Sequence, residues 1–485
     1  MKLLAWKAAD VDDIDVERAL KLAGLDVPAN ADFQISGQDP VLPSPHYLGT
    51  GAAVTRMLTG LAASDLWRLR TGRSQHVSVD ARHAAASLGS YRYARRVDEP
   101  QTAAGSAPQA RRNMDLVTRI IAARDGRYVQ LHGSFHDAPQ ILDELGLTES
   151  ASAEEVDAAV ARRDAFELEA ALIGRQVCGG VVRSRQEWAG HPQGRAMAGR
   201  PVVTITKIGE APPEPLPDGD RPTSGVRVAD LTRVLAGPTC AKTLAEHGAD
   251  VLHISAPHLE TGQMFELETG IGKRQAFLDL NVAGQAQAMR DLIQAADVFS
   301  QGYRLGTLNR RGLSPEQVAD LRPGIVYVSE NCYGPLGPWS ARPGWEQLAQ
   351  AATGMSYREG QSAPDGVPRL APAAVNDYST GFLAAYGAMI ALARRAREGG
   401  SWHVQTSLSQ VCSWYQRLGD DNDPAAAAMG MYDPEAVRPY LAEMDTDDYG
   451  RIEYLTPAVQ LSETQPRWDL PPARLGAHEA VWLPR

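Results

Sequence analysis

Short apolar runs alternate with helix-like segments along residues 226–329, and this alternation restricts the possible folds more than any other feature. Residues 226–231 (VRVADL), 250–254 (DVLHI) and 325–329 (IVYVS) have the length and the β-branched content of buried strands. The segment 314–321 opens with Ser-Pro, the order expected at the start of a helix. This β-α-β pattern predicts an α/β protein with an open, doubly wound, mostly parallel sheet. Ligands of such sheets bind at the carboxyl ends of the strands, near a topological switch point.

A proline-rich linker divides the chain. Residues 209–224 (GEAPPEPLPDGDRPTS) contain five prolines and four acidic residues, a composition incompatible with a helix or a central strand. We call residues 1–210 the first part, 225–416 the second part and 417–485 the tail. The tail is polar and weakly periodic, so we expect it to wrap over another domain instead of forming its own core.

The chain also contains an internal repeat. Residues 70–77 (RTGRSQHV) and 397–404 (REGGSWHV) share five of eight residues at an offset of 327. The same offset relates Gly60 to Gly387 on the preceding small-residue segment. The repeat indicates one structural unit that is used twice.

Composition excludes several classes of protein. With 48 Lys and Arg against 59 Asp and Glu, the formal net charge is −11, which argues against a general nucleic-acid binder. The four cysteines are single, so neither a disulfide scaffold nor a zinc ribbon is expected, and the histidines form no metal-ligand pattern. Since no secretory segment and no apolar run of about 18 residues is present, we expect a cytoplasmic protein without a membrane span and without a metal.

Asp377, in the segment 375–381 (VNDYSTG), is the first candidate for chemistry. One interpretation is that Asp377 is a helix N-cap, whose carboxylate accepts hydrogen bonds from the first turn. The other is that Asp377 is a carboxylate nucleophile at a strand-end loop. Its ordinary pKa of about 4 would leave it ionised at neutral pH.

Two further features are candidates for nucleotide binding. Residues 233–238 (RVLAGP) form either a tight turn or a backbone-lined floor for a nucleotide, with the helix start favouring phosphate. A set of cations is either scattered surface charge or a site for an anionic cofactor: Lys273, Arg274, Arg304, Arg310 and Arg311. The segment 132–136 (HGSFH) lacks the spacing of a nucleophile elbow and is interpreted as structural.

Taken together, these motifs resemble the family III CoA-transferases, which include formyl-CoA transferase, carnitine CoA-transferase and the α-methylacyl-CoA racemases. The matching blocks run in order from residue 225 to about residue 409: GVRVADLTRVLAGP, LAEHGADVLHI, GKRQAFLDLN, ADVFSQGYRLGTLNRRGLSPE, LRPGIVYVS, YGPLGPWSARPGWEQLAQAATG and VNDYSTGFLAAYGAMIALARRAREGG. The resemblance implies a Rossmann-like large domain, a smaller α+β domain and an interlocked homodimer. It also implies that Asp377 is catalytic, because the family's catalytic aspartate lies in this D-x-x-T-G context.

The resemblance further implies how substrates bind. CoA and acyl-CoA are expected as substrates and not as a tightly bound cofactor, with small carboxylic acids as the other substrates. We expect four positions to hold the nucleotide end of CoA, namely Val234, Ala236, Arg310 and Arg311. Tyr303 and Trp345 are expected to stack on the substrate or to shield it.

The first part resembles a truncated copy of the same family. Residues 40–95 would supply the repeated helix and strand and residues 96–208 a small-domain-like segment, so the first part is inferred to be the missing half of the second. No Asp or Glu lies between Asp39 and Asp65, so Asp377 alone is predicted to be catalytic. Two departures from the family pattern are the segment 255–257 (SAP) and Gly302, where an Asn is usual.

The predicted activity is CoA transfer from an acyl-CoA to a carboxylic acid through an aspartyl anhydride and an aspartyl-CoA thioester. Backbone N–H groups near Gly381 and at the helix start are expected to stabilise the oxyanions. One alternative is a racemase, but the position of its His is Trp345, whose indole cannot move a proton, and the neighbouring Glu346 is expected to point elsewhere. The other alternative is a non-catalytic CoA-binding protein.

Overall fold

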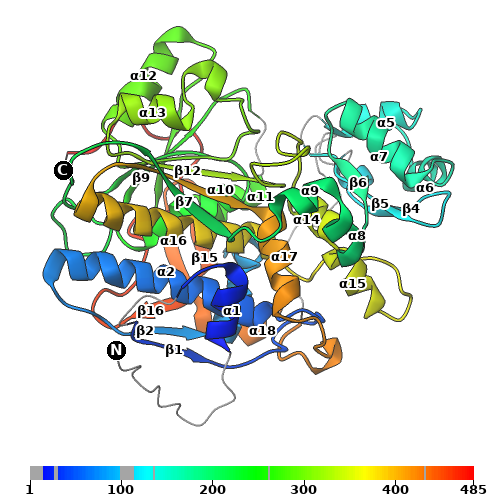
Figure 1. Cartoon of the computed structure of the whole chain (residues 1–485), viewed down its shortest axis with the longest axis horizontal. Helices are drawn as coiled ribbons and strands as arrows, with labels where there is room; N and C mark the ends of the chain where they lie inside the picture. Colours follow the sequence, from blue (N-terminus) through cyan, green and yellow to red (C-terminus); the bar gives the residue numbers. More distant parts are fainter. Residues whose placement is uncertain are drawn as a thin grey trace.

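The computed structural model describes residues 15–26, 31–98, 114–134, 137–259, 263–430 and 433–484. A seven-stranded sheet with the order β10-β9-β8-β11-β12-β13-β7 forms the centre of the chain (Figure 1). Its strands are β7 (Val203–Gly209), β8 (Arg227–Leu231), β9 (Asp250–Ser255), β10 (Lys273–Phe277), β11 (Val298–Gln301), β12 (Val326–Asn331) and β13 (Ser401–Ser407). All neighbours are parallel except β13 and β7. When β8 to β13 are numbered 1 to 6, their order in the sheet is the 3-2-1-4-5-6 order of a Rossmann sheet, which confirms the doubly wound fold.

Helices cover both faces of this sheet (Figure 1). The helices of the second part are α10 (Ala236–Glu246), α11 (Gln263–Thr269), α12 (Ala283–Gln294), α13 (Pro315–Leu321), α14 (Glu346–Thr353), α15 (Met355–Gln361), α16 (Val375–Glu398) and α17 (Leu408–Leu418). Because successive strand residues point to opposite faces, Val228 packs with α10 and α16 while Ala229 packs with α12 and α13. The predicted alternation of strands and helices therefore builds two hydrophobic layers around one sheet.

A smaller α+β unit lies at one end of the molecule and has its own hydrophobic core, as expected (Figure 1). Its antiparallel sheet has the order β4-β5-β6. Its elements are β4 (Ile120–Ala122), β5 (Tyr128–Leu131), α5 (Asp137–Glu144), α6 (Ala153–Val160), α7 (Ala165–Gly174) and β6 (Gly179–Val181), followed by α8 (Arg185–Gly190) and α9 (Pro192–Met197). The chain then enters β7, so the last residues of the segment 96–208 are part of the large sheet.

The internal repeat is confirmed as a helix, a strand and a second helix. The helix α2 (Leu48–Thr71) and the helix α16 both have 24 residues, and each end of α16 lies 327 residues after the same end of α2. The strand β2 (Val77–Asp80) corresponds at this offset to the end of β13. The helices α3 (Ala81–Ser87) and α17 begin at equivalent residues.

The two repeated units exchange strands. The strand β2 pairs in parallel with β1 (Phe33–Ser36) on one side and antiparallel with β16 (Val459–Leu461) on the other. In the same way β13 pairs in parallel with β12 and antiparallel with β7. Since β7 belongs to the first part and β16 to the tail, each unit is completed by a strand that follows the other unit in the chain. The matched pairs Val459 with Val79 and Val203 with Thr406 show that even the register is shared.

The rest of the tail lies over both units, as expected. Its elements are α18 (Pro434–Val437) and the strands β14 (Leu441–Thr446) and β15 (Gly450–Leu455), which form a sheet with β3 (Arg95–Arg96) of the first part. Trp468 packs on the main core, and its indole nitrogen donates a hydrogen bond to the carbonyl oxygen of Lys242 at 3.0 Å. The tail thus joins the first part to α10 of the second.

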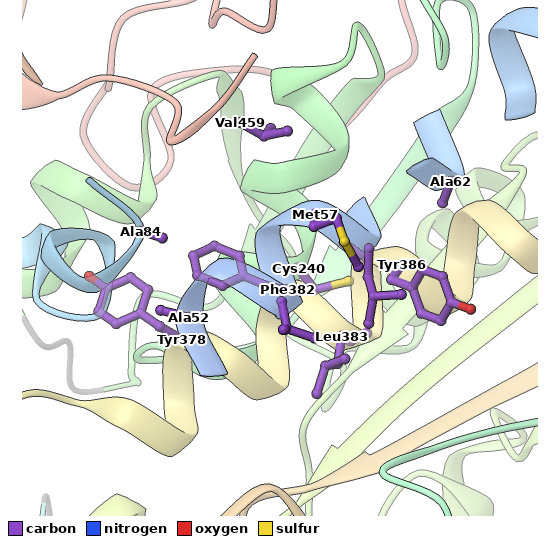
Figure 2. Close-up of a cluster of buried hydrophobic side chains, with 14 of the residues drawn as sticks. Ala52, Met57, Ala62, Ala84, Cys240, Tyr378, Phe382, Leu383, Tyr386 and Val459 are labelled. Atoms are coloured by element: carbon purple, nitrogen blue, oxygen red, sulfur yellow. The ribbon is translucent and has the colours of Figure 1, made fainter. Parts of the chain in front are cut away.

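The long helices α2 and α16 pack against each other in the main core. Figure 2 shows side chains of α2 (Met57), α16 (Phe382 and Leu383) and α10 (Cys240) meeting in one buried cluster. Glycines at equivalent positions permit the approach of each helix to its strand. A β carbon on Gly60 would lie 2.6 Å from Val77 Cγ1, and one on Gly387 would lie 2.5 Å from Val404 Cγ1.

We predict that Gly387→Ala destabilises the protein, whereas Gly284→Ala does not. The new methyl group at residue 387 meets Val404 and Val203, and overpacking of this kind costs about 1–3 kcal/mol. Gly284 lies in α12 with nothing within 4 Å of an added β carbon, so alanine gains up to about 1 kcal/mol of helix propensity there. Denaturant unfolding of both variants measures the difference. A Gly387→Ala variant as stable as the wild type would contradict the close packing of α16 on β13.

Candidate active site

Asp377 is the third residue of α16, whose N-cap is Ala374, so the interpretation of Asp377 as the N-cap is wrong. The helix start is capped instead by Glu346, the first residue of α14. Glu346 Oε2 accepts a hydrogen bond from the backbone N–H of Asp377 at 2.7 Å, and Oε1 accepts from the backbone N–H of Asn376 at 3.2 Å. Gln350 also donates to Glu346 Oε1, at 2.6 Å. Glu346 therefore lies against the candidate nucleophile and does not point elsewhere.

This capping arrangement changes two expectations about the chemistry. Burial raises the pKa of Asp377 well above its ordinary value, and the nearby charge of Glu346 raises it further, so the ordinary pKa does not describe this carboxyl group. Burial also raises the pKa of Glu346, although its hydrogen bonds oppose that shift. The backbone N–H groups of Asn376 and Asp377 are already bonded to Glu346, so they are not free to stabilise an oxyanion.

The first repeated unit keeps this cap but has no nucleophile. Asp39 accepts hydrogen bonds from the backbone N–H groups of Gly49 at 2.9 Å and Thr50 at 2.7 Å. At the repeat offset, Gly49 corresponds to Asn376 and Thr50 to Asp377. In both units a carboxylate therefore caps the start of the long helix, but the first unit has Thr50 where the second has Asp377.

The turn between β8 and α10 lies at the switch point of the sheet, between β8 and β11. Val234 in this turn has a φ of 69°, and Ala236 is the first residue of α10. The helix α16 crosses directly above, because a β carbon on Gly381 would overlap the carbonyl oxygen of Ala236. Since Gly381 follows Asp377 by one helical turn, this crossing places the start of α16 over the turn that contains Val234 and Ala236.

A buried charge network holds this turn from below. Lys273 Nζ lies 2.9 Å from Asp230 Oδ2 and donates to the carbonyl oxygen of Pro238 at 2.7 Å. Burial opposes ionisation of Asp230, but Lys273 and His253 hold its pKa below the ordinary value. Arg274 pairs with Asp250. Lys273 and Arg274 are therefore neither scattered surface charges nor a site for an anionic cofactor, since both side chains are buried and bonded within the protein.

Two of the other predicted cations, Arg310 and Arg311, lie at an open pocket of about 340 Å³ near the carboxyl ends of β10 and β11, whereas Arg304 is not among its lining residues. Arg310 and Arg311 line it together with Arg290, which the sequence did not single out. Arg311 is fixed by hydrogen bonds to the carbonyl oxygen of Leu280 and to Asn281 Oδ1, at 2.7 and 2.8 Å. Three guanidinium groups at one pocket suit a phosphorylated ligand.

Tyr303 connects this pocket to the switch point. It follows β11, and its backbone N–H donates to Gln301 Oε1 at 2.9 Å. Burial raises the pKa of Tyr303, while the charges of Arg233 and Arg311 lower it. Because β8 and β11 are parallel neighbours in the sheet, Val234, Ala236 and Tyr303 follow adjacent strand ends.

Trp345 lies where the small unit meets the second part. Its indole stacks on the imidazole of His132, with ring centroids 5.9 Å apart and an interplanar angle of 22°. Burial lowers the pKa of His132 to about 4, so this ring is neutral at physiological pH. His132 was interpreted as structural, and only its contact across the two parts, invisible in the sequence, places it beside a predicted site residue. The neighbouring His136 lies outside the described residues.

The described residues contain no helix long and apolar enough to cross a membrane. Within the same residues, no cluster of His, Cys, Asp and Glu could hold a metal ion. All four cysteines are buried thiols, and burial raises the pKa of the Cys240 and Cys332 thiols well above the ordinary value.

Comparison with known proteins matches residues 223–419 to CoA-transferase family III. An acyl-CoA transferase of Gibberella moniliformis is 32% identical over 407 residues, which cover 76% of this chain and 71% of that protein. An acetyl-coenzyme A transferase of Hypoxylon pulicicidum is 31% identical over 370 residues, or 71% of this chain and 60% of that protein. The aligned length in both fungal relatives exceeds either part of this chain, so the similarity includes residues of both parts.

Other relatives match over a shorter region. The succinyl-CoA:glutarate CoA-transferase of Mus musculus is 32% identical over 209 residues, which cover 40% of this chain and 47% of that protein. A crystal structure of a CaiB/BaiF family protein from Brucella suis is 27% identical, with a TM-score of 0.37 over 40% of this chain and 55% of that chain.

We predict that Glu346→Gln and Asp39→Asn cost similar amounts of stability but differ at the active site. Each change places an amide NH₂ against a backbone N–H donor, in a buried hydrogen bond at Glu346 and a part-buried one at Asp39, and an unsatisfied donor of this kind costs about 1–3 kcal/mol. Removing the charge of Glu346 also lowers the pKa of Asp377, whereas Asp39→Asn leaves it unchanged. Denaturant unfolding measures the first effect, and carboxyl titration by infrared or NMR spectroscopy measures the second. An Asp377 pKa that does not respond to Glu346→Gln would contradict the coupling.

Proposed function

Because the chain belongs to CoA-transferase family III, we propose that it moves CoA from an acyl-CoA to a carboxylic acid through a covalent intermediate on Asp377. The names of the relatives support transfer chemistry over racemisation, since they are acyl-CoA, acetyl-CoA and succinyl-CoA transferases. The observation that carries the proposal is the position of Asp377. Asp377 is 9% exposed and lies at a helix start above the switch point of a Rossmann sheet.

The proposed reaction proceeds in two exchanges. A carboxylate oxygen of Asp377 attacks the carbonyl carbon of the donor thioester, the C–S bond breaks, and a mixed anhydride and CoA thiolate result. The thiolate then attacks the Asp377 carbonyl carbon, which releases the donor acid and leaves an aspartyl-CoA thioester. The acceptor carboxylate takes CoA by the same two steps in reverse. Covalent catalysis of this kind replaces one difficult exchange by easier steps.

Burial of Asp377 favours this role. A carboxylate in a desolvated site is poorly stabilised by water, which is consistent with its raised pKa and makes its oxygen a stronger nucleophile once ionised. The macrodipole of α16 partly stabilises the negative charge because Asp377 lies in its first turn. The Asp377 carboxyl group must therefore lose its proton before its oxygen attacks the thioester.

CoA is proposed as a substrate that lies along the carboxyl edge of the sheet. Arg310 and Arg311 would hold the phosphorylated nucleotide end at their pocket. Val234 and Ala236 would line the path toward Asp377, with Tyr303 against CoA and Trp345 shielding the acyl end. The arginine pocket and Asp377 both lie at strand ends, as a ligand with a nucleotide at one end and a thioester at the other requires.

The first part is proposed to complete this site. Arg342 donates a hydrogen bond to the carbonyl oxygen of Gly179 at 2.5 Å, and the backbone N–H of Arg183 donates to the carbonyl oxygen of Ala351 at 2.9 Å. These contacts hold the small unit against α14, whose first residue caps α16. Together with the exchanged strands β7 and β16, these contacts support a site that the first and second parts of a single chain build together. Assembly of two such chains into a homodimer remains a separate prediction, which light scattering can test.

We predict that Asp377→Asn removes CoA transfer while leaving the fold intact. The amide cannot form an anhydride, so activity should fall by several orders of magnitude. The melting temperature should stay within a few degrees of the wild type, because Glu346 and not Asp377 caps the helix. In the wild type, hydroxylamine added during turnover should convert Asp377 to a hydroxamate that peptide mass mapping detects. Near-normal transfer by the Asn variant, with deamidation excluded by mass, would refute the mechanism.

We also predict that a chain cut within residues 210–216 remains active only when both pieces are present. Each piece lacks a strand of one sheet, since β7 then parts from β13 and β16 from β2. The separate pieces should be poorly soluble because unpaired sheet edges promote aggregation, whereas the co-expressed pieces should co-purify and transfer CoA. The cut leaves every predicted site residue in place. If the second piece alone were soluble and fully active, the first part would not complete the site.

A further inference from the structure

Glu330 is a buried acid that the proposed reaction does not yet use. It is the fifth residue of β12 and is only 8% exposed. Because strand residues alternate between faces, Glu330 lies on the same face as Val326 and Val328, which pack with α10 and α16. Its carboxyl group is therefore directed into the layer that contains Asp377.

Two glycines make room for this carboxyl group at the switch point. A β carbon on Gly302, just after β11, would lie 2.5 Å from Glu330 Oε1. A β carbon on Gly237, in the first turn of α10, would overlap the same oxygen. The unusual Gly302 of the sequence thus has a physical reason, since any side chain there would displace Glu330. The carboxyl group lies where the ends of β8, β11 and β12 converge, in the crevice where Rossmann sheets bind ligands.

The surroundings of Glu330 favour its neutral form. Its Oε2 is buried and has no hydrogen-bond partner among the described residues. Asp230 on β8 and Asp377 on α16 face it with negative charge, Lys273 on β10 faces it with positive charge, and the Cys240 thiol of α10 lies nearby. Burial raises the pKa of Glu330 well above its ordinary value, and the two aspartates raise it further. Lys273 offsets this only in part because it is already paired with Asp230.

We propose that Glu330 is the general acid that protonates the sulfur of CoA when the donor thioester breaks. This proposal rests on the proposed function. As the Asp377 oxygen bonds to the acyl carbon, the electron pair of the C–S bond moves to sulfur, and the Glu330 O–H gives its proton to that sulfur. CoA therefore leaves as the thiol, which replaces the thiolate of the reaction described above. When the thiol next attacks the Asp377 carbonyl carbon, its proton returns to Glu330. No proton is gained or lost over the exchange.

The chemistry suits an acid of this kind. A cysteine-like thiol has a pKa of about 8.5, and an acid whose pKa lies near that of the leaving group transfers a proton with little cost. An exposed glutamate would be ionised at neutral pH and could not donate. Burial and the neighbouring aspartates favour the uncharged form of Glu330, which is the form that proton donation requires.

The test compares Glu330→Gln with the wild type over a range of pH. Glutamine keeps the size and a hydrogen-bond donor but has no transferable proton, so the transfer rate should fall roughly 10²-fold or more. The wild-type rate should decline as pH rises through the raised pKa of Glu330, because the protonated form is the active one. The Gln variant should lack this alkaline limb. Glu330→Asp, which keeps a titratable acid, should retain the limb, and Glu210→Gln, whose side chain is 86% exposed, should behave as the wild type.

A second readout does not depend on transfer. An infrared spectrum at pH 7 should contain the carbonyl band of a protonated carboxylic acid that Glu330→Gln removes and Glu330→Asp shifts. A Gln variant with the wild-type rate and an unchanged alkaline limb would overturn the assignment, and so would a wild-type spectrum in which neither variant alters that band. If the Gln variant fails to fold, the Asp variant decides the question by both readouts. Absence of CoA transfer by the wild type would instead refute the proposed function.

Discussion

The pairing of β7 with β13 and of β16 with β2 is the constraint on which the rest of the structure depends. Each of these strands comes from the chain segment that follows the other repeated unit, so neither repeated unit has a finished sheet edge by itself. The pairing brings the small unit of the first part against α14. Through Glu346, α14 in turn fixes the start of α16 and hence the position of Asp377.

The two repeated units share their framework but differ in their chemistry. Both cap the long helix with a carboxylate, and both use a glycine to let that helix approach a valine of the strand. Only the second unit is preceded by the strands β8 to β11, with the β8–α10 turn and the arginine pocket, and only it has an aspartate at the helix start. The first unit has the shared framework without the aspartate, and it packs against the second unit.

The sequence predicted those features that depend on local patterns. Short stretches of sequence were enough to predict the alternation of strands and helices, the repeat at an offset of 327 and the candidate Asp377. Features that depend on distant partners could not. Glu346 caps a helix thirty residues later, and Lys273 looked like a surface cation because its partner, Asp230, lies on another strand. The exchange of β7 and β16 also joins residues that are hundreds of positions apart.

If Asp377 becomes covalently bonded to the substrate, the oxygen atoms of its carboxyl group record this directly. With an acceptor acid labelled with ¹⁸O in both oxygens, the anhydride route leaves one labelled oxygen on Asp377 in each turnover. Peptide mass spectrometry after turnover should therefore find ¹⁸O in the peptide that contains Asp377, and the released donor acid should acquire label in later turnovers. Full conversion of the donor without label in that peptide would contradict the covalent mechanism.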